Sequence, residues 1–355
     1  MSNENLARRT RPIIEFDGVD ITSAILPYLL SVTYTDNEEY EADDLTIKLQ
    51  DRESLWLEDW LEQAIKGAAA SKLKIRCTFI RENWTGGGAD EPLPCGEFEL
   101  CSVKASGPPA TVTIKATSLP FSGQMRRDKK NKAWESYTLS GIADELAGSN
   151  GLSCMYEAST DPFYKRREQS KTTDIDFLID LCKDAGISLK ATDGMLVLFD
   201  QKEYEARPHV LTIRRGNGVY TQYALNTGAA DSQYSSCRVR YAEPKTGKCI
   251  QGIAKTEDYN EDEATNQQLE IHAKVESGAE AKALAEKNLR LHNKFNRTAS
   301  FTLPGNPYLV SGVTVLLENW GGWNGKYITR KAVHTVSSSG GYTTKIELRR
   351  VLAGY

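Results

Sequence analysis

The sequence predicts a mainly β chain with an α/β segment inserted in its middle. Short runs of alternating apolar and polar residues, typical of half-buried strands, fill residues 1–118 and 205–355. Between them, residues 119–204 show the apolar spacing of amphipathic helices. Clusters of Gly, Asn and Asp separate these runs, as turns do. We therefore predict a first β-barrel domain in residues 1–118, an α/β insertion domain in 119–204 and a second β-barrel domain in 205–355.

The first region carries strand signals throughout. Residues 13–16 precede Asp17-Gly18, a pair typical of a tight turn. Residues 72–80 place apolar side chains at every second position, and one short helix is expected at residues 54–61. Further strands are expected at residues 31–35, 45–49, 98–103 and 111–116. Strands of this length and spacing favour a sandwich or a barrel.

The middle region changes to helical spacing. A helix is expected at residues 138–147 after a Ser or Thr cap, and another at 174–185. Gly186 stands where a helix C-terminal cap is expected. Residues 187–199, with Asp193-Gly194 between two apolar runs, predict a hairpin. These elements form a small α/β unit.

The last region returns to strand signals. Strands are expected at residues 210–214, 236–241, 268–273, 298–303, 314–317, 327–336 and 343–351. A helix at 278–292 forms an insertion, and residues 319–325 and 337–341 are turns. Two β-rich regions around an α/β unit suggest two related barrels.

Composition places the chain among ordinary globular proteins. The 355 residues are 40% apolar and 26% charged, and the net charge of -4 does not indicate a generic polyanion binder. No apolar segment is long enough to span a bilayer, so we expect no membrane insertion. Seven scattered cysteines without a CxxC pair predict neither a disulfide framework nor a zinc site, but reduced thiols.

An acidic run follows the strand expected at residues 31–35. Its carboxylates are Asp36, Glu38, Glu39, Glu41, Asp43 and Asp44. A carboxylate metal site and a catalytic site are the functional readings of such a run. Because no basic partner is readable nearby, we favour a polar loop that faces a lumen or a neighbouring molecule.

Three other polar or aromatic segments are not interpreted as ligand-binding sites. The basic residues 126–132 lack the interleaved aromatics of a nucleic-acid site, so we expect a solvated loop or a contact with an acidic neighbour. The glycines of residues 85–88 do not fit a phosphate-binding loop. Trp320 and Trp323 are either exposed interface contacts or core residues at a barrel end.

No enzyme motif is readable in the sequence. His209, His272, His292 and His334 have no acid or nucleophile at motif spacing, and no GxSxG is present. Structural histidines are therefore the default. We expect no catalytic, cofactor-binding or metal-binding residues and no cofactor.

A series of short motifs resembles the phage late control D family of tail proteins, and the element formed by Glu168-Gln169 and residues 173–187 is also similar to one in the N-terminal hub part of VgrG proteins. In order, these are SVTYTDNEEYEADDLTIKLQD (31–51), LPCGEFEL (93–100), SGPP (106–109), TIKA (113–116), Trp134-Glu135, LSGIA (139–143), Glu168-Gln169, TDIDFLIDLCKDAGI (173–187), LPGNP (303–307), VSGVTV (310–315), GKYI (325–328), His334 and GYTTKIEL (341–348). Each motif is weak alone, but their number and order run along nearly the whole chain.

The resemblance implies the hub of a contractile tail baseplate. Such hubs are homotrimers in which each subunit supplies two tube-like β-barrels, so three subunits form a pseudo-sixfold ring. In this family the barrel domains can be discontinuous in sequence. One face continues the hexameric tail tube, and the other receives a trimeric spike, because a sixfold surface needs an adaptor to meet a threefold one. The implied partners are a tail tube or tube-initiator protein, the spike and other baseplate proteins.

The resemblance also implies where the protein is located, and it leaves two alternative functions open. The hub is assembled in the host cytoplasm and lies in the virion tail baseplate, where DNA passes through its lumen without specific binding. Some larger relatives carry a fused peptidoglycan-degrading domain, for which the chain to Tyr355 leaves no room. A cell-wall hydrolase is the alternative from another class. A hub of a phage-derived bacteriocin or of a secretion machine shares the same fold.

Overall fold

The computed structural model describes residues 7–54, 73–84, 89–119, 124–228, 234–242, 247–257, 259–260, 266–273, 275 and 277–352. The helix expected at residues 54–61 and the glycines of residues 85–88 fall almost wholly outside these ranges. Among the described residues, no helix is long and apolar enough to cross a membrane.

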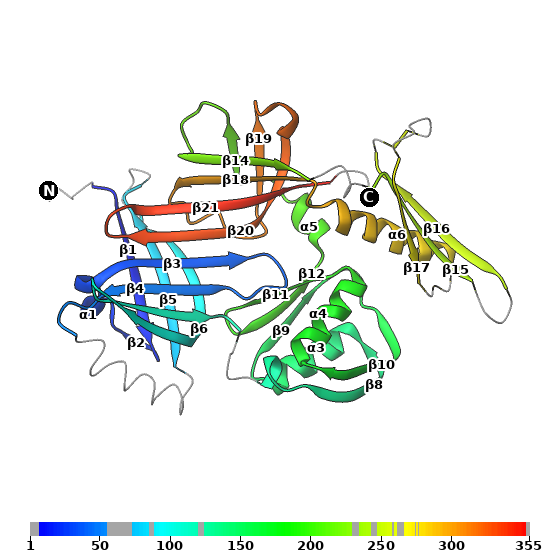
Figure 1. Ribbon diagram of the computed structural model, residues 1–355, viewed down its shortest axis with the longest axis horizontal. Helices are drawn as coiled ribbons and strands as arrows, with labels where there is room; N and C mark the ends of the chain where they lie inside the picture. The colour runs from blue at the N-terminus through cyan, green and yellow to red at the C-terminus, as the bar shows by residue number, and fades with distance from the viewer. Residues whose placement is uncertain are drawn as a thin grey trace.

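A 13-stranded sheet is the largest element of the described structure (Figure 1). Its strands are β1 (Arg9–Phe16), β2 (Val19–Asp20), β3 (Leu29–Asn37), β4 (Asp44–Gln50), β5 (Lys74–Glu82), β6 (Glu91–Ser106), β7 (Thr111–Thr117), β13 (Leu211–Arg214), β14 (Gln222–Thr227), β18 (Arg297–Pro304), β19 (Thr314–Glu318), β20 (Gly325–Ser337) and β21 (Gly341–Arg350). The main path runs β14-β18-β21-β20-β3-β4-β7-β6-β5-β1-β2, and β13 and β19 pair beside β20. The mainly β class is therefore as predicted.

The two β-rich regions belong to this one sheet. They meet at the antiparallel pair β3–β20, in which Ser31 lies opposite Ser337 and Asn37 opposite Lys331. The side chains still form two apolar clusters. One contains β1 and β3–β7 with Val336 and Tyr342, and the other contains β13 and β18–β21. The two regions are thus separate in their cores but continuous in their hydrogen bonding.

The α/β insertion lies against one end of the first region (Figure 1). Its helices are α3 (Leu139–Ser149) and α4 (Asp174–Ala185), and its strands are β8 (Lys130–Thr138), β9 (Ser153–Glu157), β10 (Phe163–Thr172), β11 (Ser188–Thr192) and β12 (Met195–Phe199). Thr138 and Thr173 cap the two helices through their side chains, and Gly186 adopts the left-handed conformation after α4. The expected helices and the hairpin at 187–199 are confirmed.

A further small unit projects from the C-terminal region. Strands β15 (Ser236–Ala242), β16 (Cys249–Lys255) and β17 (Gln268–His272) form a sheet that α6 (Gly278–Asn293) covers on one face. Gly252 lets the helix approach closely, because a Cβ there would lie 2.2 Å from the backbone nitrogen of Lys282. Figure 1 shows this unit at the end of the molecule opposite the N-terminus.

Candidate functional site

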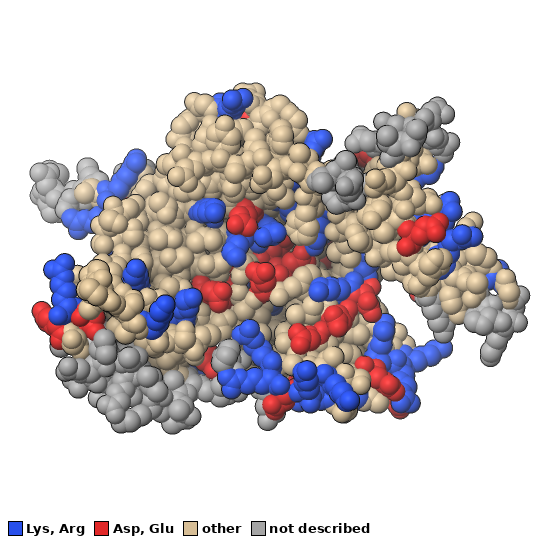
Figure 2. Space-filling model, viewed as in Figure 1, with Lys and Arg blue, Asp and Glu red and all other residues tan. Residues whose placement is uncertain are grey.

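The β3–β20 seam ends in a buried cluster of charged residues. Asp36 and Asn37 terminate β3, and the chain turns through residues 38–43 before β4 begins at Asp44. The α/β insertion packs along this turn. Tyr40 donates its backbone N–H to the Leu189 carbonyl at 2.8 Å, and Ala42 pairs with Ala191 as an isolated bridge. Figure 2 shows acidic and basic side chains gathered in the middle of one face of the molecule.

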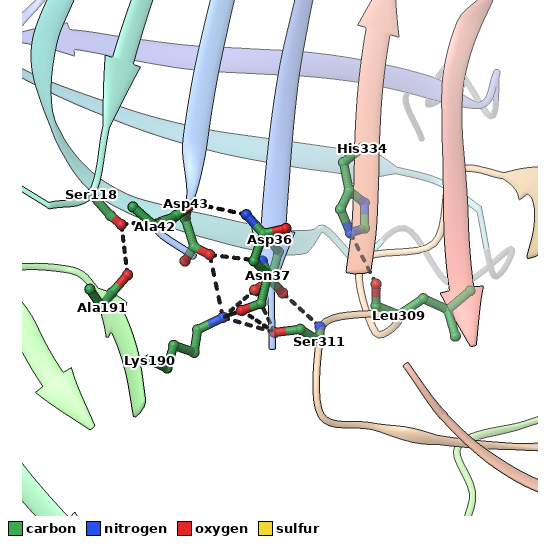
Figure 3. A network of polar contacts seen from close by, with 10 residues as sticks. All are labelled: Asp36, Asn37, Ala42, Asp43, Ser118, Lys190, Ala191, Leu309, Ser311 and His334. Carbon is green, nitrogen blue, oxygen red and sulfur yellow. Dashed lines mark hydrogen bonds and ion pairs between the residues drawn. The ribbon is translucent and has the colours of Figure 1, made fainter. Parts of the chain in front are cut away.

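Lys190, on β11, is the centre of the first part of the cluster (Figure 3). Its ammonium donates to the Asn37 carbonyl at 2.7 Å and to Ser311 Oγ at 2.8 Å, and it also binds Asp36. Asp36 in turn accepts the Ser311 backbone N–H at 2.7 Å. Three segments far apart in sequence, the end of β3, the insertion and the loop before β19, therefore meet at one lysine.

This part of the cluster has more buried acids than bases. Asp43 is 0% exposed and lies 3.5 Å from the Lys190 ammonium, and its Oδ2 atom has no hydrogen-bond partner. Burial raises the pKa of Asp43 to about 7, since Asp36 adds a like charge and Lys190 only partly offsets both effects. Burial opposes the charge of Lys190, yet Asp36 and Asp43 raise its pKa.

Arg349, on β21, is the centre of the second part. It is 1% exposed, and its guanidinium binds Glu38 at 2.9 Å and Glu205 at 2.5 Å. Glu205 lies on the short helix α5 (Gln201–Ala206) and also pairs with Arg290 of α6. Burial raises the pKa of Glu38, although Arg349 opposes this rise.

A third part, centred on Lys294, completes the cluster. Lys294, just after α6, binds Glu39, and the second oxygen of Glu39 accepts the Ser188 hydroxyl at 2.8 Å. Burial acts against the Glu39 charge, but Lys294 and Ser188 together lower the pKa of Glu39. The sheet, the α/β insertion and the α6 unit are thus joined by buried ion pairs.

The interpretation of the acidic run as a polar loop facing a lumen is wrong for its main members. Asp36, Glu38 and Asp43 are 3%, 2% and 0% exposed. The partners that the sequence did not reveal are Lys190, Lys294 and Arg349, which stand between 147 and 311 residues away along the chain. Only Glu41 and Asp44 of the run are exposed. No local spacing could have signalled pairs at such separations.

The basic run divides at Lys130: residues 126–129 are exposed, as expected of a solvated loop, whereas residues 130–132 lie in β8. Lys130, at the start of β8, binds the fully buried Asp174 at 2.5 Å. Lys132 pairs with Glu145 of α3 and lies 3.5 Å from the centre of the Trp134 ring. These two lysines therefore contact the helices of the insertion, because β8 begins within the basic run at Lys130.

The aromatic and histidine predictions resolve differently at each position. Trp320 is buried and donates its indole N–H to the Ile213 carbonyl at 3.0 Å, so it is a core residue. His334 is fully buried between the Leu309 carbonyl at 3.0 Å and the Tyr342 hydroxyl at 2.8 Å. Burial lowers its pKa to about 4, as expected of a structural histidine. His209 and His272 are exposed, and His292 packs edge-on against Tyr234.

The described residues bring together no group of three or more His, Cys, Asp or Glu able to hold a metal ion. The cluster at the seam is instead a set of ion pairs in which most acidic side chains bind a basic side chain of the same cluster. Such an arrangement fixes the relative positions of the packed units of the chain.

Comparison with known proteins identifies relatives in phage tails. No family model matches the chain. The probable baseplate hub protein of Escherichia phage 186 is 24% identical over 241 residues, which cover 66% of this chain and 58% of that protein. The probable baseplate hub protein of Escherichia phage P2 is 30% identical over 191 residues, 52% of this chain and 44% of that protein. The chain thus spans about half the length of these relatives.

Solved structures with the same fold also come from tails and secretion systems. A tail protein from Neisseria meningitidis MC58 has a TM-score of 0.67 and 12% identity, with 96% of this chain and 97% of that chain covered. The 43 kDa tail protein of prophage MuSo2 from Shewanella oneidensis has a TM-score of 0.69 and 13% identity, with 96% and 98% covered. A component of the E. coli type VI secretion system has a TM-score of 0.54 and 10% identity, with 96% and 78% covered.

These findings confirm the resemblance that the sequence motifs predict. The chain is a relative of phage baseplate hub proteins, and its fold is that of phage tail proteins, of a type VI secretion component and of the Francisella PdpA-VgrG complex.

Proposed function

We propose that this chain is the structural hub of a phage-type tail baseplate, a homotrimer that adapts a sixfold tail tube to a threefold spike. The observation that carries the proposal is a repeat within the 13-stranded sheet. Its central strands divide into two four-stranded units of the same order, β3-β4-β7-β6 and β14-β18-β21-β20. Each unit is antiparallel throughout and ends in a hairpin, β6–β7 or β20–β21.

The two hairpin strands at the ends of these units are divided in the same way. One half of β20 pairs with β19, and the other half, residues 331–337, crosses to β3. The first half of β6, from Glu91 to Glu99, pairs with β5. Residues 102–106 of β6 pair with β7 on one side, and residues 101–106 have no partner on the other side among the described strands. In both strands a register shift against the hairpin partner marks the division.

The open edge of β6 is matched by a second open edge. Strand β14 pairs with β18 alone among the described strands, and its sequence QYALNT contains neither a charge nor a proline. Natural edge strands that stay exposed are usually protected by such residues. Pairing of β6 with β14 of the next copy repeats between chains the β20–β3 seam within the chain.

A ring built on this repeat gives the proposed adaptor. Each chain supplies two units, so three chains supply six and match a hexameric tube on one face. The remainder of each chain follows threefold symmetry and suits a trimeric spike. The tube or tube-initiator protein, the spike and other baseplate proteins are the proposed partners, DNA is proposed to pass through the lumen, and the virion tail baseplate is the proposed location. No observation on the described residues favours a cell-wall hydrolase, and a bacteriocin or secretion hub uses the same arrangement.

Light scattering of the purified chain tests the proposal. We expect a species of about three times the 39.4 kDa chain mass, alone or after addition of the tube protein. Ala105→Lys in β6 and Ala224→Lys in β14 place a charge on the two open edges and should prevent association. Ala242→Lys, on an exposed position of β15, is the matched control. A wild-type chain that stays monomeric with and without the tube protein contradicts the ring.

A further inference from the structure

Two buried cysteines face one another across the β5–β6 hairpin. Cys77 on β5 and Cys95 on β6 are each 2% exposed and belong to the same apolar cluster. All seven cysteines are free thiols in this structure. The function proposed above uses neither residue.

The strand register brings the two side chains together. Cys77 lies opposite Gly96, and the next pair is Thr78 with Pro94, so Cys95 is the extra residue of a β-bulge that faces Cys77. Opposed residues in antiparallel pairs have Cα atoms about 4.5–5.5 Å apart, within the range of about 4.4–6.8 Å that a disulfide spans. Burial raises the pKa of Cys95 well above its usual value, and the Cys77 thiol raises it further.

We propose that Cys77 and Cys95 form a disulfide when the protein meets an oxidising medium. In the balanced reaction with a small disulfide such as oxidised glutathione, one thiolate attacks the reagent and releases one glutathione thiol. The second cysteine then attacks the mixed disulfide and releases the other. The protein loses two protons and two electrons, and the reagent is reduced to two thiols. Burial and the scarcity of thiolate make the reaction slow in the folded protein.

The crosslink closes at the point where the α/β insertion touches the sheet. Asp193, in the β11–β12 turn, accepts the Glu97 backbone N–H at 3.1 Å. The bulge also needs Gly96, because it has φ +93° and a Cβ there would lie 3.3 Å from Asp193. A bond from Cys95 to β5 therefore restrains both the β5–β6 hairpin and the neighbouring part of β6 that contacts the insertion through Glu97.

Thiol mapping tests this site in the full chain. The protein is incubated with oxidised glutathione and, in parallel, refolded from denaturant in a glutathione buffer so that burial cannot prevent reaction. After an acid quench, free thiols are alkylated under denaturing conditions and peptides are mapped without reduction. We expect a linked Cys77–Cys95 peptide, two fewer alkylated cysteines than the seven of the reduced chain, and an unfolding midpoint that rises and falls back with dithiothreitol.

Two variants make the result specific. Cys95→Ser should lose both the linked peptide and the rise in the unfolding midpoint. Cys154→Ser should keep both. This control is needed because Cys154 and Cys182 form the competing pair of thiols: Cys154 lies close enough to raise the pKa of Cys182. Alkylation of Cys77 and Cys95 in both protocols, or linkage of either one to another cysteine, overturns the proposal. These readouts are independent of the oligomeric state and of the hub function.

Discussion

Arg349 on the last strand binds Glu38 at the end of β3 across a sequence separation of 311 residues. Both side chains are almost fully buried. The same guanidinium binds Glu205, so one residue joins the N-terminal region, the segment after the insertion and the C-terminal strand. A contact of this kind closes the fold, and the ion pairs around it are the first targets for mutation.

Removal of Arg349 should strongly destabilise the protein. Arg349→Met leaves Glu38 and Glu205 buried without their main partner, and breaking a buried pair costs about 3–5 kcal/mol. Urea unfolding followed by tryptophan fluorescence measures the loss. The control is Arg166→Met, whose exposed pairs with Glu135 and Glu168 should change stability by less than about 0.5 kcal/mol. Equal effects of the two variants would show that the buried pair contributes nothing special.

Loss of the Lys190 ammonium should loosen the contact between the insertion and the sheet. In Lys190→Met, Asp36 and Asp43 face one another without a cation, while the apolar core of the insertion is untouched. Hydrogen exchange should therefore accelerate in residues 37–43 and in β11 but not in α3. The exposed Lys202→Met is the control. If hydrogen exchange in residues 37–43 and β11 is the same in Lys190→Met as in the wild type, the lysine does not hold the two parts together.

The charge of Asp43 should make stability fall as pH rises. Its folded pKa is raised from 3.8 to about 7, so the folded state holds a proton that the unfolded state has lost between these values. Relative to Asp43→Asn, the wild type should lose up to about 4 kcal/mol between pH 4 and pH 8, because one pKa unit is about 1.36 kcal/mol. Unfolding curves across this range give the difference, and parallel pH profiles for the two proteins would contradict it.

His334 should act with the opposite sign. Its folded pKa is lowered from 6.5 to about 4, so the unfolded state binds the proton first as pH falls. The stability that neutral His334 supports is complete above pH 6.5 and decreases by up to about 3 kcal/mol toward pH 4. His334→Gln should abolish this slope in the same unfolding assay. A slope that persists in the variant assigns the effect to another group.

Local elements with strong signals were predictable from the sequence. Helix α4 has an apolar stripe, Thr173 as its side-chain cap and Gly186 in the left-handed region after it, so all three signals agree. Strands such as β4 alternate buried and exposed residues. By contrast, β8, β10 and β14 were not predicted. Most residues of these strands are exposed, and their few apolar residues do not recur at every second position. These strands therefore lack the alternating apolar pattern that predicts a half-buried strand.

The amino-acid sequence by itself determined the mainly β class, the α/β insertion and the resemblance to phage tail hubs, because these depend on local periodicity and on the order of short motifs. The tertiary structure alone decided that β3 and β20 join two β-rich regions into one sheet. It also decided that Asp36, Glu38 and Glu39 of the acidic run pair with Lys190, Arg349 and Lys294 inside the protein rather than face solvent. Burial of a charge depends on a partner supplied by another part of the chain, and no local pattern records where that partner will lie.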